Sequence, residues 1–168
     1  LDPFGQVVFG PSNLASDDVR TRTLPVAGTY TLLVEGRRDA GGSTTYGINV
    51  QPVVQTTTAY TPGSVVAGSI DSAGRRDAYT FTLDAERRLV VDSRRNSTVF
   101  KWSLVGPRGT VVEGRNFADS DSADFTASPV LSLPAGEYTL YVDPDNDGTG
   151  TYGFRLVDLA SADVAALT

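Results

Sequence analysis

Apolar and polar residues alternate with a period of two along much of this chain, in short runs that turn-forming residues separate. Gly, Asp, Asn, Ser and Pro are concentrated between the runs, as in "DSAGRRD" and "DPDNDGTG". No window of helical length has an apolar stripe with a period near 3.6 residues. Four runs place apolar side chains on one face, namely Tyr79, Phe81 and Leu83; Phe100, Trp102 and Leu104; Tyr138, Leu140 and Val142; and Tyr152, Phe154 and Leu156. The pattern predicts an all-β protein, a sandwich or barrel, with these side chains in its core.

The sequence also contains an internal repeat. Three segments recur in the same order at an offset of 104 to 109 residues: "PFGQVVFG" (3–10) and "PRGTVVEG" (107–114), "LPVAGTYTLLVEG" (24–36) and "LPAGEYTLYVDP" (133–144), "TTYGINV" (44–50) and "GTYGFRLV" (150–157). The second copy has strand-like sequence ahead of its matched part, which the first copy lacks. We therefore predict that residues 62–168 form a complete β-sandwich unit. Residues 1–61 are predicted to be the later half of a preceding unit, ending in the linker "QPVVQTTTAYTPG".

Half a sandwich has unpaired strand edges and an uncovered apolar face, both of which favour aggregation. Tyr30, Leu32 and Val34 would need a cover. The missing strands could precede Leu1 in a longer chain, or another molecule could supply them by strand addition. A third alternative is that the half-unit packs onto the complete one.

Composition narrows the range of chemistry and partners. A net charge of −6 argues against nucleic acid as a partner, and no apolar run is long enough to insert into a membrane. Without cysteine or histidine the chain has no disulfide, no thiolate zinc site and none of the common nucleophile–base pairs. Lys101 is the only lysine, and the carboxylates lie mostly in turns. We expect a protein that is not an enzyme and needs no cofactor.

One short stretch, "DPDNDGTGTYGF" (143–154), is a candidate metal site. Asp143, Asp145 and Asp147 alternate ahead of Gly148, as oxygen ligands do at the start of an EF-hand loop. The twelfth position, where an EF-hand needs a bidentate glutamate, is Phe154, which excludes an EF-hand. Two interpretations stay open, a different kind of calcium site on these aspartates and a plain polar turn between two strands.

A glycan-binding surface would be expected to display exposed aromatic rings. The single tryptophan, Trp102, shares a face with Phe100 and Leu104 and is predicted to lie in the core. Tyr141, which alternates outward, and Tyr60, in the linker, are the remaining candidates for an exposed ring.

The order of motifs over residues 62–168 resembles that of the bacterial pre-peptidase C-terminal domain family. The segments that carry the resemblance are "GSIDSAGRRDAYTFTL", "LVVDSRRNSTVFKWSLVGPRGTVV", "LSLPAGEYTLYV" and "GTYGFRLV". Gly106 and Pro107 depart from the family, which often has aspartate there. The resemblance implies a jelly-roll-like antiparallel β-sandwich that is secreted or displayed at the cell surface, often behind peptidase domains or in tandem arrays. It implies a non-catalytic role, with carbohydrate, collagen or calcium bound by some members, and transfers no functional residue.

Our leading hypothesis is a non-catalytic extracellular spacer repeat, whose partners are neighbouring repeats or identical subunits. Strand complementation between molecules would turn such a repeat into a filament. The alternative is an accessory module of a secreted hydrolase or peptidase that binds a glycan or an extracellular protein. An enzyme comes third, and would need two carboxylates about 5 to 9 Å apart in a cleft.

Overall fold

The computed structural model describes residues 1–13, 22, 24–36, 39, 41–43, 45–120, 129–145 and 147–160. The chain divides into two compact units, Leu1–Val50 and Gln51–Thr168. The division precedes the boundary expected after residue 61, because part of the expected linker belongs to the second unit. Within the described residues there is no helix long and apolar enough to cross a membrane.

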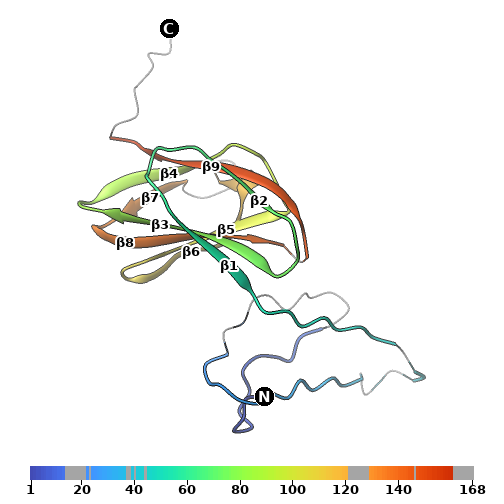
Figure 1. Ribbon diagram of the computed structural model, residues 1–168. Coiled ribbons are helices and arrows are strands. Elements are labelled where there is room, and N and C mark those ends of the chain that lie inside the picture. Colours follow the sequence, from blue (N-terminus) through green and yellow to red (C-terminus); the bar gives the residue numbers. More distant parts are fainter. Residues whose placement is uncertain are drawn as a thin grey trace. The chain divides into compact units, whose positions relative to one another are not determined.

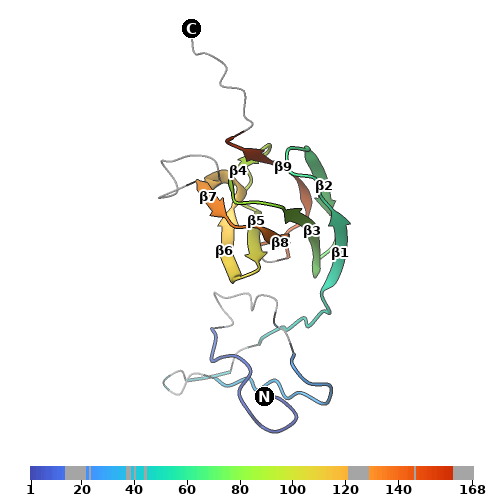
Figure 2. The same cartoon turned by 90° about the vertical axis from the view of Figure 1, so that its left-hand side faces the viewer.

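The second unit is built from strands in two sheets (Figures 1 and 2). Its elements are β1 (Val54–Ala59), β2 (Val66–Ile70), β3 (Arg75–Leu83), β4 (Arg87–Ser93), β5 (Phe100–Gly106), β6 (Gly109–Asn116), a short 3-10 helix η1 (Phe117–Asp119), β7 (Val130–Leu133), β8 (Gly136–Pro144) and β9 (Gly150–Asp158). One sheet has five strands in the order β1-β3-β8-β5-β6, and the other has four in the order β2-β9-β4-β7. The all-β sandwich is therefore confirmed, whereas the jelly-roll topology stays a prediction.

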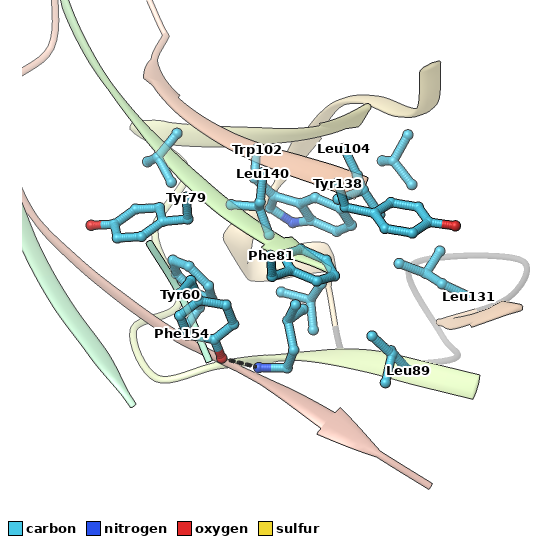
Figure 3. Packing of buried hydrophobic residues seen from close by; sticks show 14 of the residues in the cluster. Tyr60, Tyr79, Phe81, Leu89, Trp102, Leu104, Leu131, Tyr138, Leu140 and Phe154 are labelled. Carbon is cyan, nitrogen blue, oxygen red and sulfur yellow. Dashed lines mark hydrogen bonds between the residues drawn. The ribbon is translucent and has the colours of Figure 1, made fainter. Parts of the chain in front are cut away.

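The core lies between the two sheets. Figure 3 shows Trp102 and Leu140 of the five-stranded sheet, and Leu89 and Phe154 of the four-stranded sheet, among the side chains packed there. All twelve side chains that the alternation assigned to the core are buried. Several rings contact one another, including Phe81 and Tyr138, which are stacked with centroids 5.3 Å apart. The apolar inner faces of the two sheets pack against each other, so that each shields the other from water.

One strand pair is parallel, although the sequence predicted an antiparallel sandwich. β1 pairs with β3 in parallel, from Val54 beside Arg75 to Ala59 beside Thr80. The chain goes from β1 to β2 in the opposite sheet and returns for β3, so β1 and β3 run in the same direction. β1 lies within the stretch expected to be a linker. Its residues, "VQTTTA", are exposed but largely β-branched, which suits an edge strand held by backbone hydrogen bonds.

Tyr60 is buried, and its interpretation as an exposed ring in a linker is wrong. Its hydroxyl donates to the Ser64 carbonyl at 2.9 Å. It also accepts from the Leu156 backbone N–H at 3.0 Å, the bond drawn as a dashed line in Figure 3. Burial raises the pKa of the Tyr60 hydroxyl, which is accordingly held neutral. The ring extends the core beyond the end of β1 and ties that strand to β9.

A second buried polar group joins the two sheets. The Tyr152 hydroxyl of β9 donates to the Asp77 carboxylate of β3 and lies 2.6 Å from the Tyr79 hydroxyl. Burial and these neighbours raise the pKa of Tyr152 far above its usual range. Gly68 of β2 lies directly opposite Tyr152 in the ladder, and a Cβ at this position would overlap the tyrosine ring. Glycine, which has no Cβ, therefore leaves the space that the Tyr152 ring occupies beside β2.

The chain enters the sandwich at one end and leaves it at the other. Val54 starts β1 beside Arg75, where β3 begins. Asp158 ends β9 beside Leu89 and lies 3.3 Å from the guanidinium of Arg87, which follows the end of β3. Within this unit, the first and last strands therefore start and finish at opposite ends of the sheets (Figure 1).

The first unit has local turns and pairings but no strand among its described residues. Leu1 and Thr31 exchange two backbone hydrogen bonds, with the Leu1 amine donating at 2.7 Å and the Thr31 N–H at 3.0 Å. The Gly5 N–H closes a turn onto the Asp2 carbonyl at 3.0 Å. Most of its described large apolar side chains are exposed.

Candidate functional site

The structure does not gather the three predicted aspartates into one site. Asp143 lies in the last part of β8, Asp145 follows the strand, and Asp147 is exposed in the turn. The ammonium of Lys101 lies 2.8 Å from Asp145 Oδ1 and neutralises that carboxylate. Within the described part of the chain, His, Cys, Asp and Glu form no cluster of three that could hold a metal ion. Calcium binding by this stretch stays a prediction.

Calcium binding at this stretch would be visible as thermal stabilisation. A site that uses Asp145 should raise the Tm in millimolar calcium, because a ligand that binds only the folded state stabilises it. Asp145→Ala should abolish that rise, whereas Asp71→Ala, which removes a carboxylate in another loop, should keep it. An unchanged Tm of the natural chain in calcium leaves the polar turn as the interpretation.

Asp143 is the aspartate, among the described residues with a resolved shift, whose pKa the structure raises rather than lowers. It lies opposite Lys101 in the ladder between β5 and β8. Burial raises the pKa of Asp143, and the positive charge of Arg76 offsets part of that rise. The folded state therefore binds this proton more tightly than the unfolded chain does.

Because of this raised pKa, the ionised Asp143 destabilises the fold at neutral pH. We expect Asp143→Asn to raise the urea midpoint slightly at pH 7. That advantage should shrink as the pH falls through the pKa of Asp143 in the folded state. Urea unfolding at pH 7 and pH 3 tests this, with Asp147→Asn as the exposed control. At each pH, the quantity to compare is the gain in urea midpoint of Asp143→Asn over the natural chain. A gain that is smaller at pH 7 than at pH 3 would contradict the assignment.

Tyr141 is the outward-facing ring that the sequence identified. It lies on the outer face of the five-stranded sheet, between the small residues Ala78 of β3 and Ser103 of β5. The guanidinium of Arg76 stacks over the ring, with its carbon 4.6 Å from the ring centroid. Arg76 is itself held by Gln55, whose side-chain oxygen accepts from Arg76 Nε at 2.8 Å.

Sequence reasoning did not predict this pairing of Arg76 and Tyr141. The sequence contained part of the signal, because alternation places both Arg76 and Tyr141 at outward-facing positions of their strands. Those two strands are neighbours in the sheet. The strand order, which alternation does not contain, was the missing information. With Tyr60 in the core and Arg76 over Tyr141, neither of the two candidate tyrosines offers a fully open ring face for a sugar.

Proteins with some similarity to this chain are found among solved structures. No protein-family model matches the chain, and no curated protein matches it. Among solved structures, the chain is similar to the pre-peptidase C-terminal domain of a collagenase from Bacillus anthracis, with 17% identity, a TM-score of 0.45, and coverage of 65% of this chain and 100% of that one. It is also similar to PliG, a periplasmic inhibitor of g-type lysozyme, from Escherichia coli (a mutant) and from Salmonella Typhimurium. Both have 17% identity and a TM-score of 0.44, and the match covers 61% of this chain and 97% and 98% of theirs.

A pre-peptidase C-terminal domain, the family that the sequence motifs resemble, is therefore among the structures with which this chain shares similarity.

Proposed function

We propose that this chain is a non-catalytic spacer from a tandem array of β-sandwich repeats in a secreted or cell-surface protein. The observation that carries the proposal is the path of the chain through the sandwich. β1 starts at one end of the sheets and β9 finishes at the other. A unit with this path separates the points at which the chain enters and leaves it by the length of the sheets, which is what a spacer must do.

The local geometry of the first unit supports a tandem arrangement. The turn Asp2–Gly5 corresponds in sequence to Gly106–Gly109, where β5 turns into β6. Both turns carry a glycine with positive φ at the same place, 80° at Gly5 and 98° at Gly109. Two segments that share both sequence and turn geometry fit a repeated unit better than two unrelated domains.

The acidic, cysteine-free composition and the family resemblance support an extracellular location. The expected partners are the neighbouring repeats. Binding of a glycan or an extracellular protein, the alternative function, rests on Tyr141, whose ring is stacked under Arg76.

The spacer function can be tested by pulling a single molecule between Leu1 and Thr168. Tension loads β1 and β9 along their length, so their backbone hydrogen bonds to β3, β4 and β2 must break together. We expect residues 1–50 to extend without a step. A single rupture should then release roughly 32 nm, the extended length of residues 54–158 less the folded length of one strand. Gradual extension without any rupture would show that the sandwich cannot hold its ends apart, and would refute the proposal.

A further inference from the structure

We infer that residues 1–50 are an acceptor for a segment built like residues 54–104, joined to the chain ahead of Leu1, with which they form a second sandwich. The inference rests on the proposed tandem arrangement and names the partner that the first unit needs.

The register of the first unit matches that of the second. Leu1 and Thr31 exchange backbone hydrogen bonds, as Val105 of β5 and Thr139 of β8 pair in the second unit. Leu1 therefore occupies the place of Val105. The segment that would precede Leu1 in a complete unit ends at the equivalent of Leu104.

Two packing details are also shared. A Cβ on Gly28 would lie 2.5 Å from Pro3 Cγ, and one on Gly136 would lie 2.7 Å from Pro107 Cγ, so each glycine admits the proline of the facing turn. Tyr30 donates its hydroxyl to the carbonyl four residues earlier, that of Val26, at 2.6 Å. Tyr138 does the same to Pro134 at 2.8 Å. The described part of the first unit thus shares these two packing details with the later half of the second unit.

Several large apolar side chains among the described residues of the first unit are exposed. Leu32 is 51% exposed, whereas its counterpart Leu140 is fully buried. Tyr46 is 65% exposed, whereas its counterpart Tyr152 is 1% exposed. In the second unit, β3 pairs with β8, and β2 and β4 flank β9. All three of these covering strands lie between residues 54 and 104.

A second copy of this chain cannot supply the cover without losing its own. Each chain contains one segment of the covering type, residues 54–104, and two segments that need it, residues 1–50 and 105–158. A chain that donated its covering segment would expose side chains such as Leu140 and Phe154, which that segment now helps to bury. Exchange between identical chains therefore gains no buried surface, and the occupant must be an additional segment of the same type.

The experiment adds that segment in register. A copy of residues 51–104 is placed directly ahead of Leu1, so that its Leu104 is followed by Leu1 as the original is followed by Val105. The matched control is the same extended chain with Phe81→Asp in the added copy only. In the second unit Phe81 stacks on Tyr138, the counterpart of Tyr30, so this aspartate would be placed against Tyr30 in the new core.

We expect the extended chain to give two rupture events under tension where the natural chain gives one. Residues 1–50 should also become resistant to protease at least tenfold, and the control should show neither change. An extended chain that behaves like the control would overturn the inference. Protection of residues 1–50 in the natural chain that rises with its concentration would also overturn it, because a second copy would then be the occupant. The rupture of residues 51–168 is scored separately, so the spacer proposal survives or fails on its own.

Discussion

Replacing Trp102 by alanine is expected to lower the free energy of unfolding by about 4 kcal/mol, the largest effect of a single substitution that we expect in this chain. The side chain is 1% exposed and belongs to β5, between β8 and β6. Its indole N–H donates to Ser120 Oγ at 2.7 Å, and Ser120 in turn donates to the Asn116 carbonyl at 2.9 Å. Alanine would leave a cavity between the sheets and remove the donor to a buried hydroxyl.

The matched variant for this prediction is Trp102→Phe. It keeps most of the apolar volume and loses only the hydrogen bond to Ser120, so we expect a loss of about 1–2 kcal/mol. Urea unfolding followed by circular dichroism measures both variants, since Trp102 is the only tryptophan and its fluorescence is lost with it. Equal losses of stability in the two variants would mean that the volume of the indole ring does not contribute to the stability of this part of the core.

Replacing Gly68 by alanine is expected to destabilise the sandwich by about 3 kcal/mol. The new methyl group would overlap the ring of Tyr152, whose Cε2 atom lies 2.7 Å from the position of the Cβ. The ring cannot move freely, because its hydroxyl is bonded to Asp77 and Tyr79. Displacing it would leave the partly buried carboxylate of Asp77 and the buried hydroxyl of Tyr79 without this partner.

Ser69→Ala is the control for this second prediction, since it places alanine at an exposed position of the same strand. A loss below about 0.5 kcal/mol is expected there. In a Tyr152→Leu background, Gly68→Ala should be much less harmful than in the natural chain, because the overlapping atoms are absent. Additive losses in the double variant would show that the ring and the glycine do not interact as described.

The sequence predicted the core better than the strand pairing. Tyr79, Trp102 and Phe154 were assigned correctly because alternation reports which face of a strand is apolar. Alternation does not report which strand is the neighbour. The parallel pairing of β1 with β3 was therefore unpredictable from "QTTTA", which has no apolar face to orient it.

Burial of Tyr60 could not be predicted for a related reason. Its hydrogen-bond partner at Leu156 is 96 residues away, so no local pattern marks the contact. The need for glycine at position 68 also depends on Tyr152, which lies opposite only after the sheet has formed.

The candidate site shows the same limit of local patterns. The spacing of Asp143, Asp145 and Asp147 predicts a calcium site, but it does not report that β8 ends at Pro144, so that only Asp143 lies in the strand. Lys101, which pairs with Asp145, is 44 residues away in the sequence. From the sequence, Lys101 could be placed only at an outward-facing position of its strand, and its ion pair with Asp145 could not be predicted.

Hydrogen exchange of the unmodified chain of residues 1–168, measured by mass spectrometry, is the most direct test of the central claim, a closed sandwich preceded by half of another unit. Amides in β3, β5, β8 and β9, including that of Leu156, are expected to exchange only through global unfolding. Amides of residues 1–50 are expected to exchange within seconds to minutes, at every protein concentration. Slow exchange across residues 1–50, equal to that of β8 and β9, would contradict the claim, since the first unit would then already be complete.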